Sequence, residues 1–134
     1  MRLISLPKAA WLALLAGIAL AAPAAASGGI MCEGGDGVSA YLATGRLPVL
    51  QVIGANAEAG GAAWSTGPER GDGTPFAVGQ AFADSQQVLV DFVDPNFESV
   101  IVGLRLRFNG SEDLPLTGVM TVGDQSYDVQ CGEG

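Results

Sequence analysis

The segment Val100–Phe108 reads VIVGLRLRF, and an apolar side chain occupies every second position from its first residue to its last. Successive side chains of a β-strand point to opposite faces of the sheet. One face of this segment is therefore continuously apolar, and the other includes Arg105 and Arg107. This pattern is typical of an antiparallel strand with one face on a core and the other in water. We expect these residues to face the core: Val100, Val102, Leu104, Leu106 and Phe108.

The same two-residue period recurs in other segments and predicts an all-β fold. Strands are expected at 38–44, 47–54, 76–83, Gln87–Val93, Leu116–Val122 and 125–131, with a short further strand at 62–66. Gly123-Asp124 suits a two-residue hairpin, because glycine adopts positive φ at little cost. About seven or eight short strands with turn signals between them indicate a single small β-sandwich or barrel, mostly antiparallel.

Two glycine-rich segments, 28–37 and 55–75, are predicted to be loops. A loop as long as 55–75 is uncommon in a compact domain unless it has structure or a purpose of its own. Trp64 lies in its middle and is the only tryptophan after residue 26. It would be a core residue if 62–66 is a strand, and an exposed binding anchor if the segment is a loop.

Residues 1–26 have the pattern of a signal peptide. Arg2 and Lys8 precede an apolar run at 9–22, Pro23 ends the run, and three alanines follow at 24–26. The run is shorter than the roughly 20 apolar residues that cross a bilayer, so an uncleaved anchor is the less favoured alternative. We expect residues 27–134 to form one domain in the periplasm or the medium, with no stable membrane insertion after cleavage.

The predicted domain is strongly acidic. The chain has 14 acidic residues and 6 cationic ones, and the first 26 residues hold Arg2, Lys8 and none of the acids. Four arginines therefore remain in residues 27–134, with no lysine or histidine, for a net charge of −10. A field of this sign repels nucleic acid and anionic membranes, and it attracts cations or a basic partner.

Cys32 and Cys131 are the only cysteines, and in an exported chain they predict one disulfide. The last predicted strand points Cys131 inward together with Tyr127 and Val129. A bridge that encloses about 100 residues stabilises a fold by roughly 4–5 kcal/mol. A redox pair or a zinc site is less favoured, because there is no C-x-x-C spacing and no histidine.

The composition leaves little room for catalysis. Without histidine, the usual serine and cysteine nucleophile systems are excluded, and residues 27–134 have no lysine for Schiff-base chemistry. No phosphate-binding loop or dinucleotide fingerprint is present. We therefore expect a non-enzymatic binding or envelope-accessory protein. A small hydrolase with a carboxylate pair and an inhibitor of a basic secreted enzyme are alternatives.

A calcium-binding module is a further alternative, because four oxygen-bearing side chains lie close together in the sequence: Asp91, Asp94, Asn96 and Glu98. The last three match the start of an EF-hand loop. The match fails later, where Ser99 replaces the glycine and Arg105 replaces the final glutamate. The competing interpretation is a solvated surface turn formed by Asp-Pro-Asn.

Arg105 and Arg107 form the other candidate binding surface, together with Trp64. Two residues apart on a strand, their side chains leave the same face about 7 Å from each other. They could hold a carboxylate or phosphate by paired hydrogen bonds. Alternatively they pair with acids on neighbouring strands, such as Asp128 or Asp91.

Overall fold

The computed structural model describes residues 28–45 and 49–134. The predicted leader lies outside this part of the chain, as do residues 47 and 48 of the predicted strand 47–54. Ten strands form one sheet: β1 (Gly28–Glu33), β2 (Ser39–Thr44), β3 (Val52–Ala59), β4 (Ala62–Ser65), β5 (Thr74–Pro75), β6 (Ala77–Ala83), β7 (Gln87–Val93), β8 (Val100–Phe108), β9 (Leu116–Val122) and β10 (Gln125–Glu133). One short 3-10 helix, η2 (Pro68–Arg70), precedes β5. The all-β prediction is confirmed, with ten strands instead of seven or eight.

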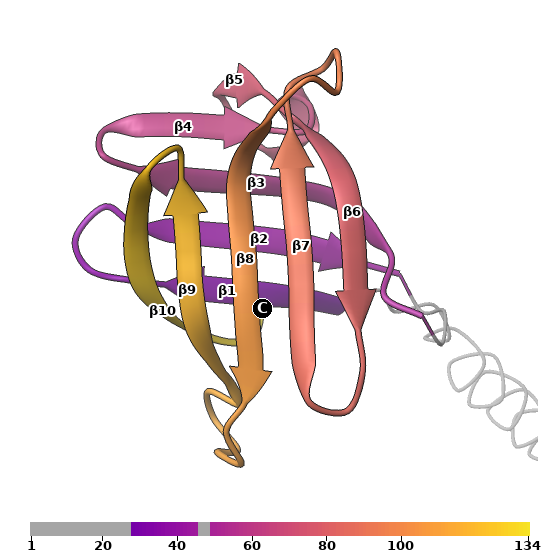
Figure 1. Ribbon diagram of the computed structural model, residues 1–134, viewed down its shortest axis with the longest axis vertical. Helices are drawn as coiled ribbons and strands as arrows, with labels where there is room; N and C mark the ends of the chain where they lie inside the picture. Colours follow the sequence, from indigo (N-terminus) through magenta and orange to yellow (C-terminus); the bar gives the residue numbers. More distant parts are fainter. Residues whose placement is uncertain (1–27, 46–48) are drawn as a thin grey trace, which may run out of the picture.

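The sheet folds over on itself into a nearly closed, barrel-like structure. Its strand order is β5-β4-β3-β2-β1-β10-β9-β8-β7-β6, so strands that follow one another in the sequence mostly lie side by side. All pairs are antiparallel except β4 with β5. β6–β10 form a front layer, and β1–β5 form a back layer whose main strands run across those of the front (Figure 1). We call these the front and back layers below.

The core lies between the layers and matches large side chains with small ones. The front layer contributes Phe92, Leu104 and Met120, and the back layer contributes alanines at 40, 55, 57 and 59. Phe76 stacks on Phe92, with ring centroids 4.5 Å apart. Small residues in one layer let the bulky residues of the other approach closely, which is how interiors reach their high packing density.

The inward face predicted for β8 is confirmed in the middle of the strand and wrong at its ends. Val102, Leu104 and Leu106 are buried, whereas Val100 is 54% exposed and Phe108 is 47% exposed. In Figure 1 the Phe108 end of β8 extends past β1, the back-layer strand nearest to it, and the Val100 end leads directly into the loop between β7 and β8. Alternation alone sets the face of a residue, and the partner layer sets whether that face is buried.

The predicted disulfide is confirmed. Cys32 of β1 and Cys131 of β10 are directly opposite in the ladder, with their Cα atoms 4.1 Å apart and an S–S distance of 2.05 Å. Both cysteines are fully buried. The bridge therefore fixes the strand pair at which the back layer continues into the front layer.

Two of the predicted boundaries are wrong. The predicted loop 28–37 contains β1, and the predicted strand 47–54 corresponds to β3, which begins at Val52 and continues into the predicted loop 55–75. β1 begins with two glycines and β3 contains glycine and three alanines, and both residue types have weak strand propensity. Pairing with neighbours on both sides outweighs this preference. The predicted short strand at 62–66 is confirmed as β4.

The predicted hairpin turn is also confirmed. Gly123 and Asp124 join β9 to β10, and Gln125 pairs with Val122. Gly123 has φ of 59°, as the first position of a type II′ turn requires. This turn sets the register of β10 and so brings Cys131 opposite Cys32.

Candidate functional site

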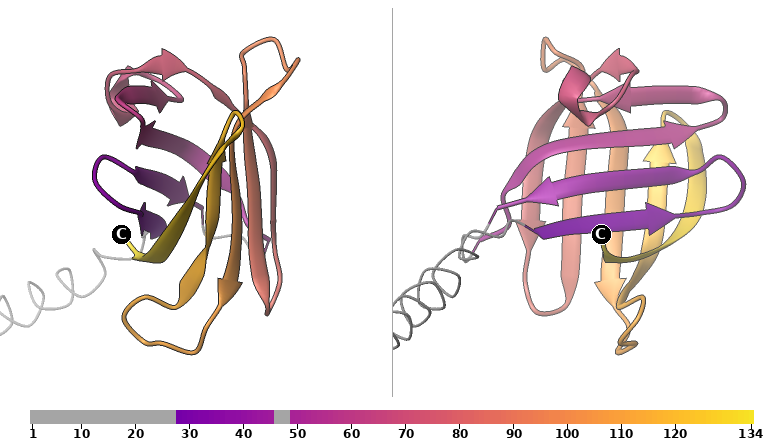
Figure 2. Two further views of the ribbon diagram at one scale, coloured as in Figure 1. Left: turned by 60° about the vertical axis from the view of Figure 1, so that its left-hand side comes forward. Right: turned by 180° about the vertical axis from the view of Figure 1, so that it is seen from behind.

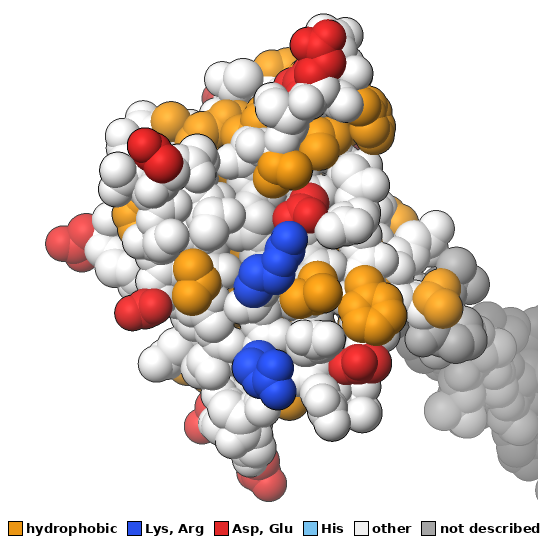
Figure 3. All heavy atoms as spheres, viewed as in Figure 1, with side chains coloured by type: hydrophobic (Ala, Val, Ile, Leu, Met, Phe, Trp, Pro, Cys, Tyr) orange, Lys and Arg blue, Asp and Glu red, His pale blue; other side chains and the backbone are white. Residues whose placement is uncertain are grey.

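The candidate arginines lie on the outward side of the front layer, which we call the outer face. Strand register arranges its side chains in rows. One row consists of Phe82, Leu89, Arg105, Val119 and Asp128. The adjacent row consists of Gln80, Asp91, Gly103, Thr121 and Ser126. Figure 3 shows this face, with hydrophobic side chains on both sides of an arginine.

A hydrogen-bonded network joins the two rows. Arg105 Nη1 donates to Asp91 Oδ1 at 2.8 Å, and Arg105 Nη2 donates to Asp91 Oδ2 at 3.1 Å. Gln80 Nε2 donates to the same Oδ2 at 2.7 Å, and Arg105 Nη1 also reaches the Leu104 carbonyl oxygen at 2.9 Å. Arg105 is thus paired with Asp91, which is one of the two partners considered from the sequence.

Because Gly103 has no side chain, the network has room above the backbone of β8. A Cβ at Gly103 would lie 2.8 Å from Thr121 Oγ1 and 3.2 Å from Asp91 Oδ1, which is tight for real contacts. Asp91 is only 8% exposed, so its charge requires partners close to the sheet surface. The bidentate arginine and the amide of Gln80 supply them.

Apolar side chains flank the network within its own row. Leu89 and Val119 are the neighbours of Arg105 on either side, and both are half-buried. Phe82 follows Leu89 and is 48% exposed. The solvated face of an antiparallel sheet is normally polar. An arginine held between aliphatic and aromatic side chains is instead the composition found at protein interfaces.

Arg107 lies in a third row, in which its neighbours are uncharged. Gln87 and Thr117 are directly opposite it, and Gln130 follows on β10. Within residues 28–45 and 49–134, no carboxylate lies at salt-bridge distance from Arg107. The guanidinium is exposed and adds positive charge to the outer face beside the neutralised Arg105.

Trp64 lies in strand β4 and not in a loop. It is opposite Ala57 in the β3–β4 ladder, on the inward side of the back layer, and it packs against the core. Its side chain is half-buried. The core interpretation of Trp64 therefore fits the structure, and this residue lies apart from the arginines of the outer face.

Two of the four candidate calcium ligands, Asp91 and Asp94, have separate partners. Asp91 faces Arg105, whereas Asp94 accepts backbone N–H groups of Asn96, Glu98 and Ser99 at 3.1, 2.8 and 2.6 Å. The hydrogen bond from Ser99 lowers the pKa of Asp94 most, against the opposing effect of desolvation. In the part of the chain that the structure describes, no group of three or more acidic or cysteine side chains is placed to hold a metal ion.

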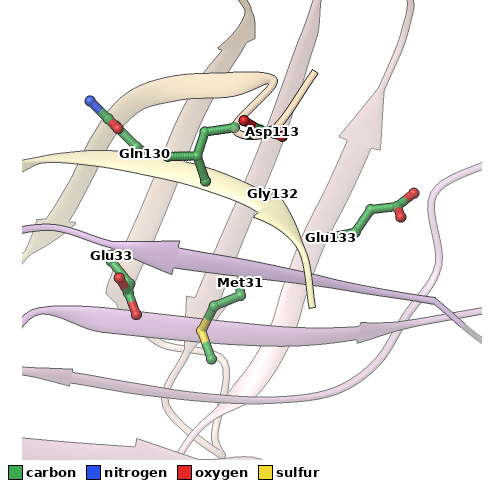
Figure 4. Close-up of a pocket in the computed structure, with 7 residues that line it drawn as sticks. Met31, Glu33, Asp113, Gln130, Gly132 and Glu133 are labelled. Atoms are coloured by element: carbon green, nitrogen blue, oxygen red, sulfur yellow. The ribbon is translucent and has the colours of Figure 1, made fainter. Parts of the chain in front are cut away.

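Two open grooves are candidate ligand sites. One, of about 290 Å³, is lined by Glu33, Asp113 and Glu133 among others (Figure 4). Figure 4 shows the side chains of Glu33 and Glu133 pointing in different directions, so these two do not face each other as the carboxylate pair of a glycosidase does. The other, of about 570 Å³, has a mainly apolar lining that includes Ile30 and Phe108, with Thr44 and Glu133 as its polar side chains.

Comparison with known proteins gives no further guide to function. No family model matches the chain, and no curated protein or solved structure matches it. Among the described residues, no helix has the length and apolarity needed to cross a membrane. The sequence alone identifies Arg105 but not Gln80, Phe82 or Leu89, because their places in the two rows beside it depend on strand register. Gly103 in the middle of β8 is the sequence signal that another group closely approaches the backbone there.

Proposed function

We propose that residues 27–134 form an exported, non-enzymatic binding domain whose contact surface is the outer face of the front layer. The observation that carries the proposal is the Arg105–Asp91–Gln80 network between the half-buried Leu89 and Val119. An arginine whose side chain is already ordered loses less freedom on binding. Arginine and aromatic side chains also supply most of the energy at protein interfaces.

Export is supported by the leader pattern of residues 1–26 and by the buried disulfide. Structural disulfides persist in oxidising compartments, such as the periplasm and the medium. A scaffold closed by a bridge between Cys32 and Cys131 would hold the outer face in a fixed shape after secretion. We therefore place the binding function in the periplasm or the medium.

Substitution of the outer face tests this function. The protein would be immobilised and exposed to secreted and envelope proteins of the producing cells. Leu89→Ser should remove the retained partner, because it replaces the apolar neighbour of Arg105. Ile53→Ser is the matched control, since Ile53 is 50% exposed on β3 of the back layer and belongs to none of the rows of the outer face. Equal retention by both variants, with unchanged melting temperatures, would contradict the proposal.

A further inference from the structure

The loop between β7 and β8 projects past the ends of both strands (Figures 1 and 2). It comprises residues 94–99. Phe97 has φ of 59°, and within residues 28–45 and 49–134 it is the one non-glycine residue with positive φ. It is also 64% exposed. The loop therefore holds a large aromatic residue in an unfavourable backbone conformation and leaves its ring in water.

Asp94 gives this loop a defined shape. Its carboxylate accepts three backbone N–H groups of the loop, and its own N–H donates to the Ser99 carbonyl at 3.1 Å. The N–H of Phe97 donates to the Asp94 carbonyl at 2.8 Å. These bonds hold the backbone of Phe97 in place from both sides. The aromatic residue is therefore presented by an ordered loop, which lowers the entropy lost on binding.

The fold itself gains little from an aromatic residue at this position. Glycine would adopt the left-handed conformation without the clash that a Cβ causes. A ring that stays mostly exposed also returns little of the free energy that burial would give. Strained residues of this kind are concentrated at functional sites. An aromatic side chain contributes most when a partner buries it.

The charge around Phe97 indicates what that partner is. Asp94 and Glu98 lie in the same loop, which has no cation, and acidic side chains are visible at the top of the molecule in Figure 3. Val100, 54% exposed, adds apolar surface at the base of the loop. Residues 27–134 carry a net charge of −10, which repels an anionic membrane and a second copy of this chain. The same charge attracts a basic protein.

We propose that the β7–β8 loop is an insertion element that places Phe97 in an apolar cleft of a basic protein. The inference rests on the proposed binding function and names the chemistry of its partner. The loop connects the two strands that carry Asp91 and Arg105, so a protein seated on the outer face lies next to it. The outer face would then support the partner while the phenyl ring fills its cleft.

Photo-crosslinking tests the inference. A benzophenone amino acid would replace Phe97 in one sample and Phe108 in another, because Phe108 is 47% exposed at the opposite end of β8. Both samples would be irradiated with the secreted and envelope proteins of the producing cells. The expected result is a product from position 97 that contains a protein with more lysine and arginine than acidic residues. An acidic crosslinked protein, or equal labelling from both positions, would overturn the inference.

Binding by the purified crosslinked protein then separates the two proposals. Phe97→Ala should raise its Kd at least about tenfold, as expected for a buried aromatic anchor. Phe97→Tyr should keep most of the affinity, and added salt should slow association. If Leu89→Ser weakens binding while Phe97→Ala changes the Kd less than about twofold, the outer face binds and the insertion element is refuted. If neither variant weakens binding, both proposals fail.

Discussion

The network on the outer face predicts that removing Arg105 destabilises the fold more than removing Arg107. It also predicts that removing Asp91 as well restores part of the lost stability. Arg105→Ala removes both hydrogen bonds to Asp91 and leaves that carboxylate, only 8% exposed, with Gln80 alone. The ion pair itself contributes at most about 1 kcal/mol, because the Arg105 side chain is 48% exposed. A buried carboxylate with too few partners adds roughly 1 kcal/mol more. We expect Arg105→Ala to lower the free energy of unfolding by about 1–2 kcal/mol, or the melting temperature by about 5–10 °C.

Urea unfolding of four variants measures these differences in the free energy of unfolding. Arg107→Ala is the matched control, since Arg107 is exposed on the same strand and should change stability by less than about 0.5 kcal/mol. Asp91→Ala in the Arg105→Ala background should recover part of the loss, because no poorly solvated charge remains. Asp91→Ala alone supplies the fourth corner of the cycle. Losses that simply add, or an Arg105→Ala variant as stable as Arg107→Ala, would refute the reasoning.

Three other features of the chain give predictions that can be measured on the purified protein. Replacing Cys32 and Cys131 together by serine should lower the free energy of unfolding by roughly 4–5 kcal/mol, measured in urea, because the bridge joins residues 99 apart. The pKa of Asp94 is lowered in the folded state, so its contribution to stability is complete above the unfolded value near 3.8 and is lost as the pH falls through the folded value. Acid unfolding curves of Asp94→Asn should lack that component, and identical curves would contradict the assignment. Millimolar calcium should leave the melting temperature unchanged, because Asp91 and Asp94 already have partners; a rise that Asp94→Asn abolishes would restore the calcium alternative.

The strands that could be predicted are those in which branched apolar residues alternate with other side chains. β7, β8 and β9 have the bounds expected from the sequence. β1 and β3 were missed or shifted because glycine and alanine give no clear two-residue signal. Their strand conformation comes from pairing on both sides, which is a property of the whole sheet.

The candidate site shows the same division between local and long-range information. Alternation alone placed Arg105 on the outward face, but its partner depends on the register between β7 and β8. That register shifts by one residue near Val93, and no local pattern announces the shift. The left-handed conformation of Phe97 could not be predicted from the sequence either, because proteins usually place glycine or asparagine at such positions. Both features result from how the loop closes between two strands that are already paired.

Hydroxyl-radical footprinting with the retained partner tests the central claim most directly. The outer face should be covered in the complex, so oxidation of Phe82 and Leu89 should fall well below its level in the free protein. Ile53, exposed on the back layer, should be labelled equally in both states. Unchanged oxidation of Phe82 and Leu89, or protection confined to Ile53, would show that the outer face is not the contact surface.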